Sequence, residues 1–134
     1  MKTITYILGL SIIFVMNPDP QNKEKNKKLQ LETKQEIDSV EYDLLVFEPG
    51  FEAFLATVPY PKEFYGNEYY KNWNVLYVSE WNARALNPLK YGDFYETQID
   101  YQSNIDYGID LNFKLYQYFQ FIEKEYGITL IKRK

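Results

Sequence analysis

The sequence predicts a single small α+β domain, with two or three short strands packed against two main helices and one short helix. Apolar and aromatic residues recur at helical spacing over 67–86 and 110–126, which indicates the two main helices. Short apolar or alternating runs between turn residues indicate the strands. The 134 residues allow one domain rather than two.

The first strand and the short helix are predicted from the segment around Pro49. Residues 42–47 form a short apolar run that stops before Pro49 and Gly50, as expected of a largely buried strand. A helix can begin at Pro49, because apolar residues then recur at helical spacing as far as Val58.

The two main helices carry recognisable end signals. Asn67 is the expected N-cap of the helix over 67–86, and Asp110 is the expected N-cap of the helix over 110–126. Gly127 follows the second helix and allows the left-handed turn that often ends a helix.

The remaining strands are predicted from weaker patterns. Residues 94–101 alternate loosely between aromatic or apolar and polar side chains, which predicts a half-exposed strand paired with residues 42–47. Residues 128–131 could add a short third strand.

The ends of the chain differ in composition from the aromatic-rich domain over 42–131. Residues 1–17 place a lysine before an apolar run, the layout of a secretory signal, and this run is shorter than the roughly 20 residues that a spanning helix needs. Residues 18–41 are rich in Lys, Asn, Gln and Glu, which predicts a disordered polar tether, with an exposed helix over 28–39 as the alternative. Residues 132–134 form a basic tail, more typical of solubility than of function.

These features predict an exported protein, periplasmic or associated with the cell envelope. It would touch the membrane only through its N-terminal segment, if that segment is not removed. The alternative is an N-terminal helix or strand that is buried in the domain.

Composition excludes several kinds of chemistry. The chain has no His and no Cys, so it can form no Ser-His or Cys-His nucleophile pair, no Cys/His zinc site and no disulfide. Its net charge of −4 gives no overall positive field, so nucleic acid is not an expected partner. The 14 Tyr, 9 Phe and 2 Trp can fill a small core well.

An aromatic stripe on the helix over 67–86 is the candidate ligand-binding site. At 100° per residue, Trp73, Tyr77, Glu80, Trp81 and Arg84 lie on one side of this helix. If the stripe lines a groove, the rings can stack on a ligand while the charged pair orients its polar groups, an arrangement that suits sugars. If the stripe faces the core, Glu80 and Arg84 form a structural pair that holds the helix to a Tyr hydroxyl or a loop backbone.

Oxygen-bearing side chains over residues 100–112 suggest a calcium loop at first sight. The segment fails the EF-hand template, because Ile105 stands where glycine is needed and Leu111 where the bidentate Glu belongs. We favour turn residues, with Asp106 or Asp110 capping the following helix, and predict no metal site and no cofactor.

Carboxylates near aromatic residues keep a hydrolase open as an alternative, because a pair of them can act as acid and base without His. The candidates are Glu80, Asp93, Glu96 and Asp100.

Five aromatic and Asn-rich strings resemble an uncharacterised family of small bacterial envelope proteins, a domain of unknown function. The strings are residues 47–52, 69–74, 78–82, 91–96 and 104–112. The resemblance covers roughly residues 42–130 and implies no activity, substrate or site. It implies that members often carry a lipid-accepting Cys after the signal, and this chain has no Cys.

Taken together, the sequence predicts a non-enzymatic binding or interaction module of the cell envelope, whose partner is an envelope protein or a glycan. A small carboxylate-dependent glycan hydrolase and a structural accessory subunit are the alternatives.

Overall fold

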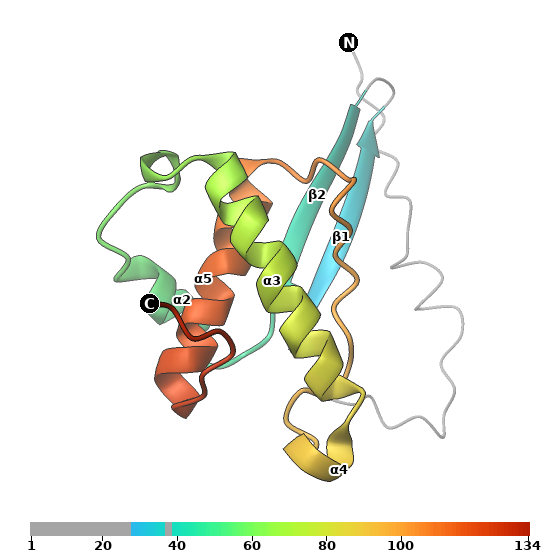
Figure 1. Ribbon diagram of the computed structural model, residues 1–134. Coiled ribbons are helices and arrows are strands. Elements are labelled where there is room, and N and C mark those ends of the chain that lie inside the picture. Colours follow the sequence, from blue (N-terminus) through green and yellow to red (C-terminus); the bar gives the residue numbers. More distant parts are fainter. Residues whose placement is uncertain (1–27, 37–38) are drawn as a thin grey trace.

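A β-hairpin and two long helices form the body of this α+β fold (Figure 1). The computed structural model describes residues 28–36 and 39–134. The predicted signal segment, 1–17, and the tether as far as residue 27 lie outside the described residues. In chain order the elements are β1 (Leu29–Glu36), β2 (Ser39–Val46), α2 (Phe51–Ala56), the 3-10 turn η1 (Lys62–Phe64), α3 (Asn67–Ala85), α4 (Pro88–Tyr91) and α5 (Ile109–Tyr126).

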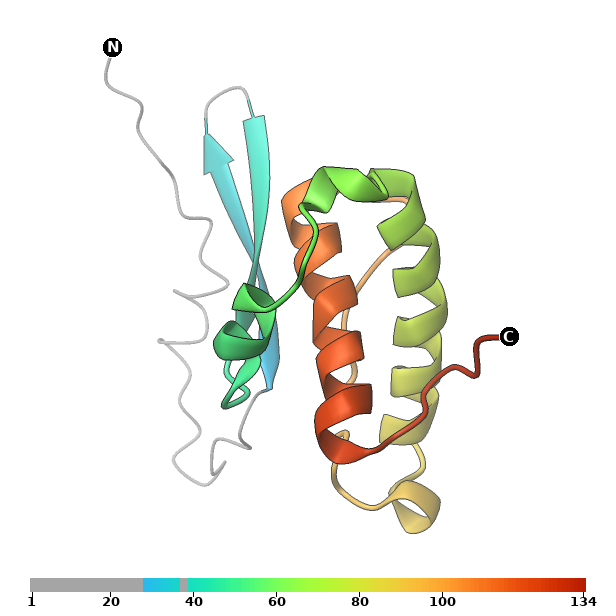
Figure 2. The same cartoon turned by 90° about the vertical axis from the view of Figure 1, so that its left-hand side faces the viewer.

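Helix α5 is the central layer, with the hairpin on one side and α3 on the other (Figure 2). Nine of its residues are buried, including Tyr116, which lies off the helix's main apolar stripe. A helix covered on two sides needs apolar residues around most of its circumference. The rings of α5 therefore fill two interfaces at once.

The predicted helices are confirmed, but two of their expected caps are not. Helices α3 and α5 begin after Gly66 and Gly108, and neither has a side-chain cap. Both glycines have φ of 83°, in the left-handed region where a side chain is strained, so glycine is what lets the chain turn into each helix. Asp106 accepts a hydrogen bond from the Gly108 N–H at 3.2 Å, which stabilises the turn before α5. Asp110 points instead to Lys62.

The tether predicted over 18–41 is wrong in its second half, and so is the alternative helix over 28–39. Residues 29–36 and 39–46 pair as antiparallel strands, with Leu29 opposite Val46 and Leu31 opposite Leu44. These four side chains pack against the core, while on β1 the polar residues Gln30 and Glu32 alternate with them on the other face. Because the apolar positions recur every second residue, they form one face of a strand and could not form a helical stripe.

The strand predicted over 94–101 does not form, because α3 uses the backbone groups that would build it. The indole N–H of Trp81 donates to the carbonyl of Thr97 at 3.0 Å. The side chain of Asn82 accepts from the N–H of Ile99 at 2.7 Å and donates to its carbonyl at 2.9 Å. This segment is thus held to a helix by side chains rather than by a sheet.

Residues 128–131 do not form a third strand either. Glu123 Oε2 accepts the N–H groups of Leu130 and Ile131, at 2.8 and 3.4 Å, and Glu123 Oε1 accepts the Tyr77 hydroxyl at 3.1 Å. One carboxylate therefore ties the last segment of the chain to both long helices.

Several tyrosine hydroxyls lie inside the core. Tyr118 is fully buried, and within the described part of the chain its hydroxyl, like that of Tyr70, has no hydrogen-bond partner. Burial raises the pKa of Tyr118 and of Tyr116 well above the ordinary value of 10.0, and raises the pKa of Tyr101 to about 12. The folded chain therefore favours the neutral form of these groups.

We expect the fold to lose stability above about pH 10. The folded state keeps protons on buried tyrosines that the unfolded chain releases, so their contribution is complete below pH 10 and is lost as the pH rises toward the folded pKa values. Tyr118 alone should lower the unfolding midpoint by about 4–8 °C per pH unit. Thermal unfolding followed by circular dichroism from pH 8 to pH 12 measures this, and Tyr118→Phe should flatten the profile. A midpoint that does not change up to pH 11 would contradict it.

Candidate functional site

Two of the predicted ligand-binding residues, Tyr77 and Trp81, lie in the core. They are 0% and 1% exposed. The ring of Tyr77 stacks on Phe119 of α5, with centroids 5.0 Å apart and planes 10° from parallel. Neither ring therefore offers a face to a ligand arriving from solvent.

Glu80 and Arg84 form the structural pair that the sequence left open as an alternative. Arg84 Nε donates to Glu80 Oε1 at 2.8 Å, Nη1 donates to the Tyr95 hydroxyl at 2.8 Å, and Nη2 donates to the carbonyl of Thr129 at 2.9 Å. One donor of this guanidinium thus bonds within α3, and the other two join α3 to the loop after α4 and to the last segment of the chain.

Removing this guanidinium should destabilise the fold. We expect Arg84→Ala to cost about 2–3 kcal/mol in urea unfolding, because the Tyr95 hydroxyl and the Thr129 carbonyl lose a charged partner. Arg84→Lys should recover less than half of this, because one ammonium group cannot reproduce the three-way geometry. Glu80→Gln retains an acceptor and should cost less than about 1 kcal/mol. An Arg84→Ala variant as stable as the wild type would contradict this role.

Trp73 is half-buried and is covered by a cation from the end of the chain. The Arg133 guanidinium carbon lies 4.0 Å from the Trp73 ring centroid, a cation–π contact. Its two terminal nitrogens donate to the hydroxyls of Tyr116 and Tyr77 at 2.9 and 3.1 Å. The predicted basic tail, 132–134, therefore contains one residue with a packing role.

Two of the exposed aromatic rings meet just before α3, away from the buried part of the predicted stripe, while Phe47 and Tyr126 are exposed elsewhere. Phe64 is 64% exposed and Tyr65 is 45% exposed. Their rings meet edge to face at 4.8 Å, and Tyr65 stacks on Tyr69 at 4.2 Å with planes 14° apart. We call the exposed and half-buried rings of this cluster the aromatic platform. It consists of Tyr60, Phe64, Tyr65, Tyr69 and Trp73.

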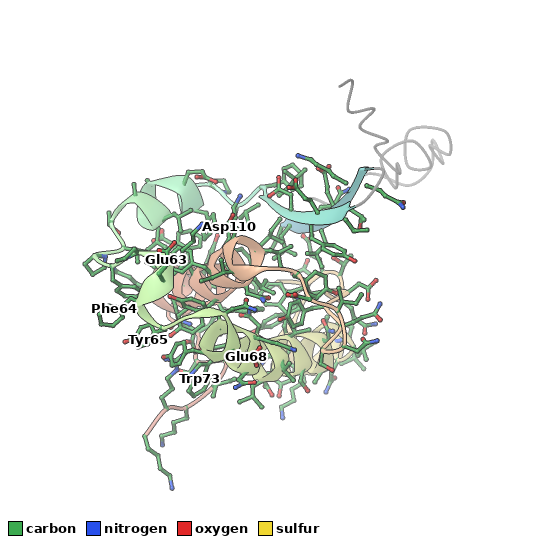
Figure 3. The ribbon with its side chains drawn as sticks, turned by 90° about the horizontal axis from the view of Figure 1, so that it is seen from above. Glu63, Phe64, Tyr65, Glu68, Trp73 and Asp110 are labelled. Atoms are coloured by element: carbon green, nitrogen blue, oxygen red, sulfur yellow. The ribbon has the colours of Figure 1, made fainter. Side chains whose placement is uncertain are left out.

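Carboxylates lie beside the platform. Figure 3 shows Phe64, Tyr65 and Trp73 along one edge of the molecule, with Glu63, Glu68 and Asp110 near them. Lys62 pairs with Asp110 and lies 4.0 Å from Glu63 Oε1. Exposed hydrogen-bond acceptors therefore flank a set of exposed rings.

The local chain geometry explains why these rings point outward. Pro61 precedes the single turn η1, and Gly66 then redirects the chain into α3. Phe64 and Tyr65 lie between these two turns, where connecting segments normally run over the surface. The sequence signal for the platform was thus the pair of turn motifs at 60–61 and 65–66, which a search for helical periodicity does not use.

Two hollows in the described part of the chain are a very small cavity and an open depression. One has a volume of about 20 Å³, room for a single water molecule, and Glu96 lines it. The other is an open depression of about 290 Å³ over α2 and α5, lined by Phe54, Phe121 and Lys124 among others. Of the four carboxylates considered for hydrolysis, Glu96 is the one that lines either hollow.

Residues 28–36 and 39–134 contain neither a cluster of metal ligands nor a helix suited to spanning a membrane. No group of three or more Asp or Glu side chains there is placed to hold a metal ion. None of the helices in these ranges is both long and apolar enough to cross a membrane.

Comparison with models of protein families shows which family the chain belongs to. Residues 5–133 match the model of a family described as "Family of unknown function (DUF6146)". The chain belongs to DUF6146. The match confirms the resemblance to a domain of unknown function and extends it from residues 42–130 to nearly the whole sequence. Nothing among the curated proteins or the solved structures matches the chain.

Proposed function

We propose that this member of DUF6146 is a non-enzymatic binding module that is exported and acts at the bacterial cell envelope. The signal-like pattern of residues 1–17 supports export, and the polar composition after it is consistent with a linker to the folded domain. The aromatic platform supports binding.

The observation that carries the proposal is the exposure of Phe64 and Tyr65. Large apolar side chains that gather on a surface typically mark a binding site, whereas single exposed ones do not. Ring contacts with Tyr60 and Tyr69 hold both side chains in place, so a ligand would order little that is not already ordered.

A glycan is the ligand class that this surface suits best. Sugar rings can pack their C–H faces on aromatic rings, and their hydroxyls need acceptors such as the carboxylates of Glu63 and Glu68. Both residues are exposed, Glu63 next to Phe64 and Glu68 next to Tyr69 in the sequence. An envelope protein is the other expected partner, since aromatic anchors also dominate protein interfaces.

We do not propose the hydrolase alternative. It requires two carboxylates on either side of an accessible sugar-binding cleft. Glu80, its first candidate acid, is bound by Arg84 at 2.8 Å, and no observation favours another pair.

A ligand screen with variants tests the proposal. Thermal unfolding of the full chain is measured with neutral oligosaccharides and with soluble peptidoglycan fragments. Ligand at 100 times its dissociation constant should stabilise the fold by about 2.7 kcal/mol, or roughly 10 °C. Phe64→Ala and Tyr65→Ala should abolish this shift and change the ligand-free midpoint little, because both side chains are exposed.

Leu89→Ala is the matched control, since Leu89 is fully exposed on α4, away from the platform. It should leave the ligand-induced shift intact. A shift that survives Phe64→Ala and Tyr65→Ala would place the ligand elsewhere. No shift with any glycan, together with no partner cross-linked through the platform, would favour the structural accessory role instead.

A further inference from the structure

The hairpin has two edges, and its register shows which backbone groups face outward. Strands β1 and β2 pair with Leu31 opposite Leu44, and the Phe47 N–H donates to the Lys28 carbonyl at 2.7 Å. In an antiparallel pair, every second residue is bonded to the partner strand and the residues between them face away. On β1 the residues whose backbone N–H and C=O face away from β2 are therefore Leu29, Leu31, Thr33 and Gln35.

The two edges are not equivalent. On β2, the outward N–H of Leu44 donates to the Asp43 carboxylate at 2.8 Å, so a side chain already occupies the middle of that edge. On β1, no backbone hydrogen bond joins the outward groups to any other segment that the structure describes. In Figure 1, β1 is the strand farther from α5, and residues 95–99 lie near its first residue, Leu29, with which they line a small cavity. An open strand edge is a template for another strand.

From these observations we infer that β1 pairs antiparallel with β1 of a second copy of the chain, forming a symmetric dimer with a four-stranded sheet. Two-fold symmetry makes the same strand serve both sides of the interface. The axis is perpendicular to the sheet, so the helices of both copies lie on the same face. This inference is independent of the proposed function, because it does not involve the aromatic platform.

Among the registers centred on residues 32, 33 and 34, the charges on β1 favour one. When the pairing is centred on Thr33, Glu32 faces Lys34 of the second copy, and by symmetry the attraction occurs twice. Centring on Glu32 would place two glutamates opposite each other, and centring on Lys34 would place two lysines opposite each other. Opposite charges directly across a strand pair stabilise it and like charges destabilise it, so the register centred on Thr33 is favoured.

The dimer would enlarge the sheet. An isolated hairpin of two strands is marginal in water and becomes stable when it packs against a helix or joins further strands. In this protein α5 covers one face of the hairpin, and pairing through β1 would extend the same sheet without uncovering that face.

A charge swap tests the inference. Sedimentation of the full chain between about 1 and about 100 μM should show a monomer–dimer equilibrium. Lys34→Glu or Glu32→Lys should weaken dimerisation about tenfold or more. The double variant Glu32→Lys/Lys34→Glu should restore it, because the same two attractions form with the charges exchanged. Circular dichroism of each variant confirms that the hairpin, where Lys34 faces Glu41, remains folded.

Two proline variants distinguish the edges. Thr33→Pro removes one outward N–H from β1 and should abolish the dimer, since proline is tolerated on an edge but cannot donate to a new strand. Val40→Pro removes an outward N–H from β2, where the side chain is 48% exposed, and should leave the dimer intact. A wild-type chain that is monomeric at the highest concentration, a double swap that fails to restore association, or a dimer that survives Thr33→Pro would each overturn the inference.

Discussion

Replacing Trp81 by Ala is expected to destabilise the fold by about 3–5 kcal/mol. The indole is 1% exposed and meets the rings of Tyr95 and Tyr118 at 4.9 and 5.9 Å. The variant loses this packing and leaves the Thr97 carbonyl without the indole N–H. Chemical unfolding at neutral pH measures the effect.

Two companion variants keep this prediction testable if the alanine variant fails to fold. Trp81→Phe retains a ring and should cost about 1–2 kcal/mol, chiefly for the lost hydrogen bond and volume. Leu76→Ala, on the same helix and 53% exposed, should change stability by less than about 0.5 kcal/mol. A Trp81→Ala variant of wild-type stability would mean that the stripe on α3 lines an open site.

Asn112→Ala is the second variant with a large expected effect, a loss of about 2–4 kcal/mol. The Asn112 side chain donates to Asn67 Oδ1 at 2.7 Å and accepts the Tyr101 hydroxyl at 2.8 Å. The residue is 1% exposed. Removing its amide leaves partners from two other parts of the fold without a hydrogen bond. The Asn74 amide, which donates to the Asn112 backbone carbonyl at 2.9 Å, keeps its partner.

Asn112→Asp gives this prediction a pH signature. The carboxyl group has nearly the same shape and can still accept from Tyr101, but when ionised it cannot donate to Asn67. Burial raises the pKa of a carboxyl group, so the variant should be more stable at pH 4 than at pH 8 relative to the wild type. Asn104→Ala, in an exposed loop, is the control and should be neutral. A neutral Asn112→Ala variant would show that the network adds nothing to stability.

The long helices could be predicted because their apolar residues recur at helical spacing over many turns. Helix α5 ends at Gly127, whose φ of 62° is the left-handed turn expected from the sequence. The first residues of the two helices were harder to predict, because Gly66 and Gly108 turn the chain before Asn67 and Asp110 could act as caps.

The strands were less predictable for two physical reasons. Polar residues outnumber apolar ones in β1, which gives this segment the composition of a tether. Its apolar residues nevertheless recur at every second position, as in a strand. Residues 94–101 alternate too, but Glu96 has φ of 48°, which breaks an extended chain, and side chains of α3 take the backbone groups.

The candidate site could also be predicted only in part from the sequence. Helical spacing groups Trp73, Tyr77 and Trp81 on one side of α3 but does not say whether that side faces solvent. That depends on α5, which packs against it. Phe64 and Tyr65 lie in a turn and so belong to no helical or strand repeat of apolar residues. Their exposure therefore became apparent only in three dimensions.

Hydroxyl-radical footprinting of the full chain, read by mass spectrometry, most directly tests the claim that α3 turns its stripe inward while the platform faces solvent. Phe64 and Tyr65 should be oxidised rapidly, and Tyr77 and Trp81 should be protected until the chain unfolds. Addition of a ligand that raises the unfolding midpoint should protect Phe64 and Tyr65. Oxidation of Tyr77 and Trp81 as fast as that of Phe64 in the folded chain would contradict the account, because the stripe would then line an open cleft.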